Sequence, residues 1–190
     1  MRDKMPDKPK VVIISGPSGV GKSTICTELV RKLEGLYRSV SVTTRQKSDT
    51  EEDGKDYWFV SKQQFRNMID KAELLEYAEV FGNLYGTPKT AVDEALQDDK
   101  TVILEIDVQG AKQAKTIYPD AVMIFILPPT KKELAERMNL RGREENTVAE
   151  KRLSQADREI AAAWQYYEHM VINEDVDRAV SEVIRIIEQS

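Results

Sequence analysis

Eight consecutive residues near the start of the chain have the composition of a phosphate-binding loop. The segment 16–23 reads Gly-Pro-Ser-Gly-Val-Gly-Lys-Ser and matches the pattern G-x-x-x-x-G-K-[ST] without a gap. Glycines let successive backbone N–H groups point at phosphate oxygens with no Cβ in the way. Lys22 can reach the β- and γ-phosphates, and the Ser23 hydroxyl can bind Mg²⁺. The pattern predicts a site for a nucleoside triphosphate with its magnesium ion.

The charged stretch 137–152 contains a second group of residues that could take part in catalysis. Its basic residues are Arg137, Arg141, Arg143, Lys151 and Arg152, which lie among several acids. Arg137 and Arg141 are four residues apart and would share one face of a helix. Phosphoryl transfer concentrates negative charge between donor and acceptor, and converging arginines stabilise such charge. The alternative is a solvated charged surface, which we favour for Arg143 and Lys151.

The only cysteine and the only histidine exclude two other kinds of chemistry. Cys26 has no second cysteine with which to form a disulfide, and with His169 alone it makes no Cys/His zinc site. Since Cys26 falls inside a predicted helix, we expect a small buried apolar side chain and not a nucleophile.

Strands and helices alternate around these residues. The apolar runs 11–14, 102–106 and 122–127 predict strands, and helices are expected over about 23–35, 89–97, 109–117, 130–141 and the C-terminal stretch from 176. Ser61 with Gln64, and Thr130 with Glu133, have the spacing of capping boxes. Because the strands show no polar alternation, they are expected in a parallel sheet covered on both faces. The predicted fold class is α/β, with a parallel central sheet flanked by helices.

Length and composition exclude several classes of protein. The 190 residues, 41% hydrophobic and 32% charged, predict one soluble globular domain. The net charge of -5 argues against binding to long nucleic acids or to a membrane surface. There is no apolar run of the roughly 20 residues that a bilayer span needs. The charged residues 1–10, with two prolines, predict a flexible tail and no signal peptide, so a cytoplasmic location is expected.

Five further segments follow the loop in order along the chain. They are Ser-Val-Thr-Thr-Arg at 41–45, Gly-Lys-Asp-Tyr at 54–57, Leu-Glu-Tyr-Ala at 75–78, Gly-Asn-Leu-Tyr-Gly-Thr at 82–87 and Glu-Ile-Asp-Val-Gln-Gly at 105–110. Together with the loop, this ordered set resembles the guanylate kinase family over nearly the whole chain. The resemblance implies a P-loop kinase core at 11–41, 92–134 and 156–190, a GMP-binding part at 42–91 and a helical lid at 135–155. The implied reaction moves the γ-phosphoryl of ATP to GMP, and to dGMP as well, with Mg²⁺ as the cofactor.

The resemblance also implies roles for individual residues. ATP would contact Gly16, Pro17, Ser18, Gly19, Val20, Gly21, Lys22, Ser23 and Thr24, with Asn173 near the adenine. The GMP phosphate would be held by Arg45, Tyr57 and Tyr85, and the guanine surrounded by Ser41, Glu76, Thr87 and Asp107. Lys22, Arg45, Arg137, Arg141 and Arg152 would be catalytic through their charge, and Ser23 would bind the metal. Asn173 could equally be a helix cap. No general base is expected, since the acceptor phosphate is already a nucleophile.

The residue types suit guanine on chemical grounds. Guanine presents N1–H and N2–H₂ as adjacent donors and O6 as an acceptor. A carboxylate such as Glu76 accepts from both donors, and the hydroxyls of Ser41 and Thr87 can donate to O6. Adenine has an acceptor at N1, which would face the lone pairs of Glu76. A buried site of this kind rejects the mismatched base by a factor of about 10⁴.

One position departs from the family pattern. The family usually has a second phosphate-binding arginine three residues after its Thr-Thr-Arg, where this chain has Ser48 followed by several acids. Losing that charged hydrogen bond is expected to weaken GMP binding by about 1.5–3 kcal/mol, with Lys47 as a partial substitute. We therefore predict a raised KM for GMP, and a lower one after Ser48→Arg.

Two other functions stay open from the sequence. One is a non-catalytic guanylate-kinase-like module that binds protein partners, although such modules typically lack an intact Gly-Lys-Ser loop. The other is a P-loop kinase with a different phosphorylated acceptor, suggested by Ser48. The sequence leaves the oligomeric state open between monomer and homodimer.

Overall fold

A five-stranded parallel sheet forms the centre of the computed structural model, which describes residues 3–4, 11–139 and 146–190. Its order is β11-β10-β2-β9-β4, and every neighbouring pair is parallel. The strands are β2 (Val11–Ser15), β4 (Leu36–Arg38), β9 (Thr101–Glu105), β10 (Val122–Leu127) and β11 (His169–Ile172). This arrangement confirms the predicted α/β fold class.

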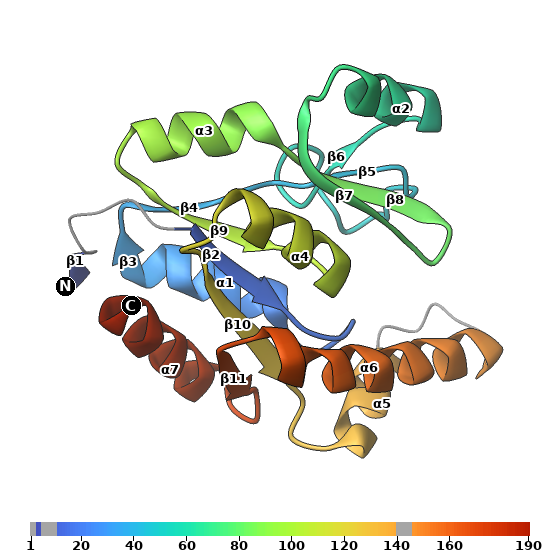
Figure 1. The fold of residues 1–190 in the computed structure, drawn as a ribbon. Helices are drawn as coiled ribbons and strands as arrows, with labels where there is room; N and C mark the ends of the chain where they lie inside the picture. Colours follow the sequence, from blue (N-terminus) through green and yellow to red (C-terminus); the bar gives the residue numbers. More distant parts are fainter. Residues whose placement is uncertain (1–2, 5–10, 140–145) are drawn as a thin grey trace.

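Helices cover both faces of this sheet (Figure 1). They are α1 (Lys22–Lys32), α3 (Lys89–Gln97), α4 (Val108–Ile117), α5 (Lys131–Asn139), α6 (Asn146–Tyr166) and α7 (Val176–Gln189). The predicted range 89–97 agrees with α3 at both ends. In the described part of the chain, no helix is both long and apolar enough to cross a membrane.

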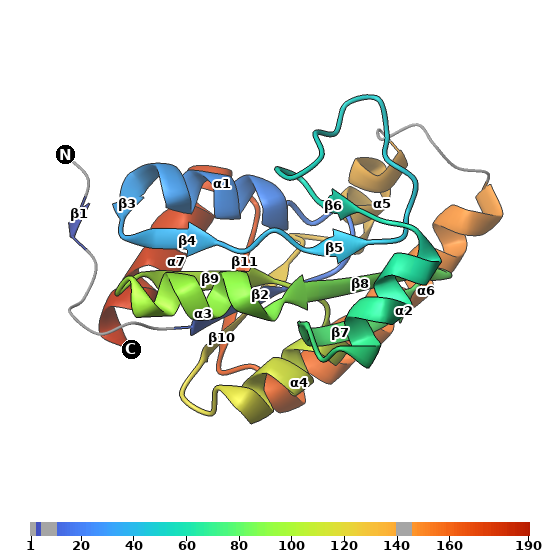
Figure 2. The same ribbon diagram turned by 90° about the horizontal axis from the view of Figure 1, so that it is seen from above.

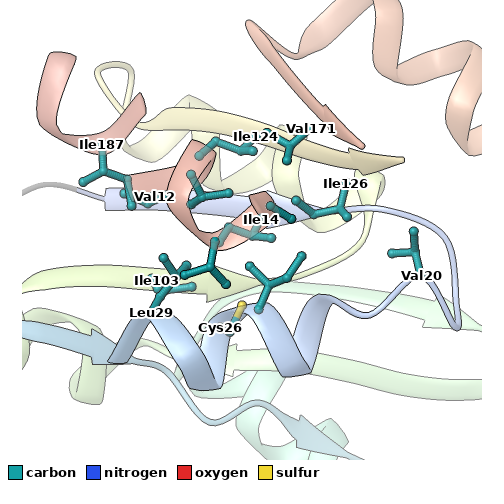
Figure 3. Packing of buried hydrophobic residues seen from close by; sticks show 14 of the residues in the cluster. Val12, Ile14, Val20, Cys26, Leu29, Ile103, Ile124, Ile126, Val171 and Ile187 are labelled. Carbon is teal, nitrogen blue, oxygen red and sulfur yellow. The ribbon is translucent and has the colours of Figure 1, made fainter. Parts of the chain in front are cut away.

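Two apolar clusters form because successive residues of a strand point to opposite faces. Val12 and Ile14 of β2 pack with residues of α1 and α7, as Figure 3 shows for Leu29 and Ile187. Cys26 belongs to this cluster and is fully buried, as predicted, and burial raises the pKa of its thiol. On the other face, Val11 and Ile13 join a cluster that includes small residues of α3, α4 and α6.

A second, four-stranded sheet lies between β4 and α3 in the sequence. Its order is β6-β5-β8-β7, from β5 (Val42–Thr43), β6 (Trp58–Phe59), β7 (Leu74–Val80) and β8 (Asn83–Pro88). With α2 (Lys62–Asp70) it stands at the upper right of Figure 1, and Figure 2 shows it from above. The predicted capping box of α2 is confirmed, because Ser61 and Gln64 bond each other's backbone N–H. That 42–91 binds GMP and that 135–155 closes as a lid remain predictions.

The smaller sheet is attached to the core through α4. The Gln113 side chain donates from Nε2 to the Tyr77 carbonyl (2.8 Å) and accepts from the Tyr77 N–H at Oε1 (3.3 Å). The amide thus takes the place of a neighbouring strand along β7, which is the edge of its sheet. This contact fixes the smaller sheet against the helix that follows β9.

Two short features complete the fold. β1 (Asp3–Lys4) pairs in parallel with β3 (Leu33–Glu34), which directly follows α1. The other residues of the predicted tail lie outside the described ones. At the turn before β6, the Trp58 indole packs on Gly54, which has φ +77°, and a Cβ there would stand 2.8 Å from the ring. Glycine is therefore required at that turn by both its backbone and its neighbour.

Candidate active site

The phosphate-binding loop connects β2 to α1, as its sequence context predicts. Gly16, Gly19 and Gly21 have φ of 151°, 82° and 101°, in a region that side chains with a Cβ rarely adopt. A Cβ at Gly21 would also collide with the Asn173 amide. These glycines let the loop turn tightly into the N-terminus of α1, where free N–H groups favour an anion.

The two loop side chains with a predicted role in binding, Lys22 and Ser23, already form hydrogen bonds within the protein. Lys22 Nζ donates to the carbonyls of Gly16 (2.6 Å) and Pro17 (3.2 Å). Ser23 Oγ donates to Glu105 Oε1 over 2.7 Å. The other Glu105 oxygen forms an ion pair with Arg38 Nη2, also at 2.7 Å. A hydroxyl beside a carboxylate is a pair of oxygen ligands that suits Mg²⁺.

Glu105 and Arg38 are site residues that the sequence reasoning missed. Glu105 ends β9, the strand next to β2, so the parallel sheet carries it to the same edge as the loop. An acid at the end of a buried strand was the available signal, and the P-loop enzymes as a class use such an acid near the metal. Arg38 gave no comparable signal, because nothing in the sequence shows that β4 pairs with β9.

Asn173 and Arg137 hold the loop from behind. Asn173 is buried, and its Nδ2 donates to the Val20 carbonyl over 2.8 Å. Arg137 Nη1 donates to the Asn173 carbonyl (3.0 Å) and lies 3.5 Å from the Val20 carbonyl. Asn173 is not the N-cap of α7, which is Asp175. Both residues therefore support the backbone of the loop in this structure.

A cavity of about 210 Å³ runs from the loop to the smaller sheet. It brings together eleven of the predicted site residues, namely Gly16, Ser18, Gly19, Gly21, Lys22, Ser23, Ser41, Tyr57, Glu76, Tyr85 and Asp107. Glu105, Phe81 and Glu159 also line it and were not predicted. The predicted residues outside the lining are Pro17, Val20, Thr24, Arg45, Thr87, Arg137, Arg152 and Asn173. Arg141 lies outside the described residues.

Glu76 is the buried acid at the far end of this cavity. Its side chain comes from β7, is 4% exposed and accepts at Oε1 from Thr87 Oγ1 on β8 over 2.7 Å. Burial is the main reason why its pKa is raised to about 7, and the charge of Asp107 adds to the effect. Oε2 lies so close to Gly110 that a Cβ there would overlap it. Asp107 caps α4 through Oδ1, which accepts from the N–H groups of Gln109 and Gly110.

Arg45 lies beside the two tyrosines with which it was grouped. Its Cζ is 5.4 Å from the centre of the Tyr57 ring, and the Tyr57 and Tyr85 rings meet edge to face at 5.9 Å. The guanidinium forms a two-bond ion pair with Glu51, an acid to which the sequence assigned no role. That pair keeps the pKa of Arg45 above its usual range.

Of the predicted lid arginines, Arg152 faces the tip of the smaller sheet. Its Cζ lies 5.6 Å from the centre of the Phe81 ring, in the turn between β7 and β8. Glu159 lies about two helical turns further along α6, and its Oε1 accepts a hydrogen bond from Gln155 Nε2 (3.2 Å). Burial raises the pKa of Glu159. The helix α6 therefore contributes the acid Glu159 to the cavity lining, whereas Arg152 lies outside the lining, against Phe81.

The site lies at the carboxyl ends of parallel strands, where a glycine-rich loop opens a helix and a second polar pocket shares its cavity. This defines the class of P-loop phosphotransferases that act on a small acceptor. The family model described as guanylate kinase matches residues 8–190. The chain belongs to the guanylate kinase family.

Individual relatives agree with this assignment over most of their length. A guanylate kinase of Carboxydothermus hydrogenoformans is 44% identical over 180 residues, covering 95% of this chain and 88% of the relative. One of Clostridioides difficile is 46% identical over 177 residues, covering 93% and 86%. The crystal structure of guanylate kinase from Anaplasma phagocytophilum superposes with a TM-score of 0.79 at 31% identity, covering 97% of this chain and 87% of that one.

Proposed function

We propose that this chain transfers the γ-phosphoryl group of ATP to GMP, giving ADP and GDP. The observation that carries the proposal is the shared cavity, which has Lys22 and the phosphate-binding loop at one end and the buried Glu76 carboxylate at the other. This arrangement supports the binding of a donor phosphate and a purine acceptor next to each other in one cavity.

The acceptor half is proposed to select guanine. Glu76 has one oxygen on the Thr87 hydroxyl and the other near the N-terminus of α4. When ionised, this carboxylate can accept from the N1–H and N2–H₂ groups of guanine, whereas adenine would present an acceptor to it. Since Ser41 lines the same cavity, its hydroxyl is available to the base edge. None of these proposed contacts involves the 2′-hydroxyl of the ribose, so dGMP is proposed as a second acceptor.

The donor half is proposed to bind ATP with Mg²⁺. The loop N–H groups and Lys22 would bind the phosphates, and Ser23 with Glu105 would hold the ion. Held by these two residues, the ion would supply positive charge next to the phosphates during transfer. The hydrogen bond of 2.7 Å between Ser23 Oγ and Glu105 Oε1 supports this assignment, because it brings two oxygen atoms that could bind the ion together.

Catalysis is proposed to rest on positioning and charge. The residues with a role are Lys22, Arg45, Arg137, Arg141 and Arg152. Lys22 is at the cavity itself, whereas Arg137 is bonded behind the loop and Arg152 lies against Phe81. Arg152 would have to leave the Phe81 ring to reach the phosphates. We therefore propose that α6 moves relative to the turn between β7 and β8 when both nucleotides bind.

An acceptor panel tests the proposal. ADP release would be followed with ATP and Mg²⁺ in the presence of GMP, dGMP, AMP, UMP or no acceptor. We expect turnover with GMP and dGMP, and turnover with AMP lower by about 10⁴-fold. ATP binding without any GMP-dependent turnover would favour the non-catalytic module. Preference for another phosphorylated acceptor would favour the third alternative.

A further inference from the structure

The carboxylate of Glu51 is enclosed by a short loop that also contains the proposed phosphate-binding arginine. Oε1 accepts from Arg45 Nη2 (2.6 Å) and Oε2 from Arg45 Nη1 (2.9 Å). Oε2 also accepts from the Ser48 N–H (2.9 Å) and from Ser48 Oγ (2.7 Å). The Glu51 side chain is only 19% exposed. Four hydrogen bonds at one carboxylate make a rigid arrangement, and the pKa of Glu51 is lowered to about 2, chiefly by Arg45.

The bonds of Arg45 can be counted against its five N–H donors. Nη1 donates to Glu51 and to the Gln46 carbonyl (3.0 Å), and Nη2 donates once to Glu51. In the described residues, Nε–H and the second Nη2–H donate to no carboxylate or backbone carbonyl. These two N–H groups point the same way along one edge of the guanidinium, which is the geometry that binds a phosphate through two parallel bonds. Glu51 therefore uses the end of the fork, and the uncharged Tyr85 hydroxyl is a further hydrogen-bond partner of the guanidinium. Among the described residues the remaining donors face no second acid, so an acceptor phosphate would be the stronger partner for them.

The plane of the guanidinium is fixed as well. Its Cζ is 5.4 Å from the centre of the Tyr57 ring and 5.7 Å from that of Phe59. The Arg45 N–H donates to Thr43 Oγ1 (3.1 Å), which ties the backbone to β5. Since Tyr57 also lines the cavity, the arginine is held next to the space where an acceptor would lie.

We propose that Glu51 is a positioning residue that orients Arg45 for the acceptor phosphate. Ser48, in the position where the family usually has a second arginine, fixes Glu51 instead of contacting the phosphate. The inference rests on the proposed function, because it takes the acceptor to be a nucleoside monophosphate. A Ser48→Arg substitution would supply a cation but would remove the hydrogen bond from Ser48 Oγ to Glu51.

The test compares Glu51→Gln with Glu52→Gln as the matched control. Glu52 is the next acid, is 69% exposed, and its carboxylate pairs only weakly with Lys55, at 3.2 Å. Calorimetry would measure the binding of GMP and of guanosine, which lacks the phosphate, and steady-state assays would separate KM from kcat. We expect Glu51→Gln to weaken GMP binding about tenfold, the scale of one charge-assisted bond, and to leave guanosine binding within about twofold. Glu52→Gln should match the unsubstituted enzyme.

Ser48→Ala is a milder second variant. It removes one of the four bonds to Glu51 and should weaken GMP binding about threefold, with no additional loss when it is combined with Glu51→Gln. Guanosine binding also shows that each variant is folded at the site. Unchanged or tighter GMP binding by Glu51→Gln in an active enzyme would overturn the positioning role, and tighter binding would identify Glu51 as a competitor of the phosphate. No GMP turnover by the unsubstituted enzyme would instead overturn both proposals.

Discussion

At the scale of single residues, Glu76 couples the acceptor site to pH. With a pKa raised to about 7 by burial, the carboxyl of the empty site holds a proton below that pH. Guanine donors need the ionised form, so guanosine affinity should fall as the pH drops from 8 to 6, approaching tenfold per unit below the pKa. Guanosine is the better ligand here, because it has no phosphate that titrates in this range. A flat affinity profile by calorimetry would contradict the assignment.

The Glu76 carboxyl also makes stability depend on pH, but in the opposite direction: low pH favours the folded state, whereas high pH favours guanine binding. Its pKa in the folded chain is above the ordinary value of 4.5. Between these two values the folded state binds more protons than the unfolded state, so this group makes the free energy of unfolding fall as pH rises from 4.5 to 7. Above pH 7 its contribution is constant. Urea unfolding of Glu76→Gln beside the unsubstituted chain should show this pH-dependent component only in the latter.

Gly110 is predicted to determine where the Glu76 carboxylate lies. Because a Cβ would overlap Oε2, Gly110→Ala should displace the carboxylate and raise the KM for GMP at least about tenfold, with the KM for ATP unchanged. Alanine is favoured over glycine inside a helix by about 1 kcal/mol, so the fold itself should be preserved. Gln109→Ala, at the exposed neighbouring position, is the control. Equal KM values for GMP in the two variants would show that Glu76 can move without loss.

At the scale of elements, the Gln113 amide joins α4 to the edge of the smaller sheet. Gln113→Ala should expose the Tyr77 N–H and carbonyl and cost about 1 kcal/mol in the free energy of unfolding. Hydrogen exchange at the Tyr77 amide should accelerate more than exchange in β2. The exposed Gln63, in α2, provides the control substitution Gln63→Ala. If exchange in β7 is the same in both variants, the two parts are held together by other contacts.

The elements also show how far the sequence could be used. The three apolar runs were predictable because burial on both faces is a local signal, and so was the start of α2, because the Ser61–Gln64 capping box has a fixed spacing. β4 and β11 were missed, since two- to four-residue strands take their identity from the neighbours they pair with. α6 spans 21 residues, but the charged 137–152 stretch hides its apolar side. The residues of the phosphate-binding loop were predictable because their pattern is local in the sequence. The ion pairs Arg38–Glu105 and Arg45–Glu51 were not predictable, because each depends on the folded positions of its two side chains.

At the scale of the whole molecule, the charge distribution predicts which anions compete with the substrates. The net charge is -5, yet Lys22, Arg38 and Arg45 lie at or beside one cavity. A short polyphosphate should therefore compete with ATP, whereas duplex DNA should leave the KM for ATP unchanged, because it needs an extended basic surface. Both would be measured in the coupled assay at low salt. Inhibition by DNA at similar phosphate concentrations would contradict this picture.

Because Trp58 packs on Gly54, its intrinsic fluorescence can report on the loop 45–57, which contains Arg45 and Glu51. The chain has two tryptophans, and Trp164 on α6 is 67% exposed, whereas Trp58 is 48% exposed and stacked on the turn that follows Glu51. Trp164→Phe would leave Trp58, which directly follows Tyr57, as the single tryptophan of the chain. The wavelength of maximum emission of Trp58, and the quenching of that emission by iodide, would then report the ordering of this loop as the acceptor binds.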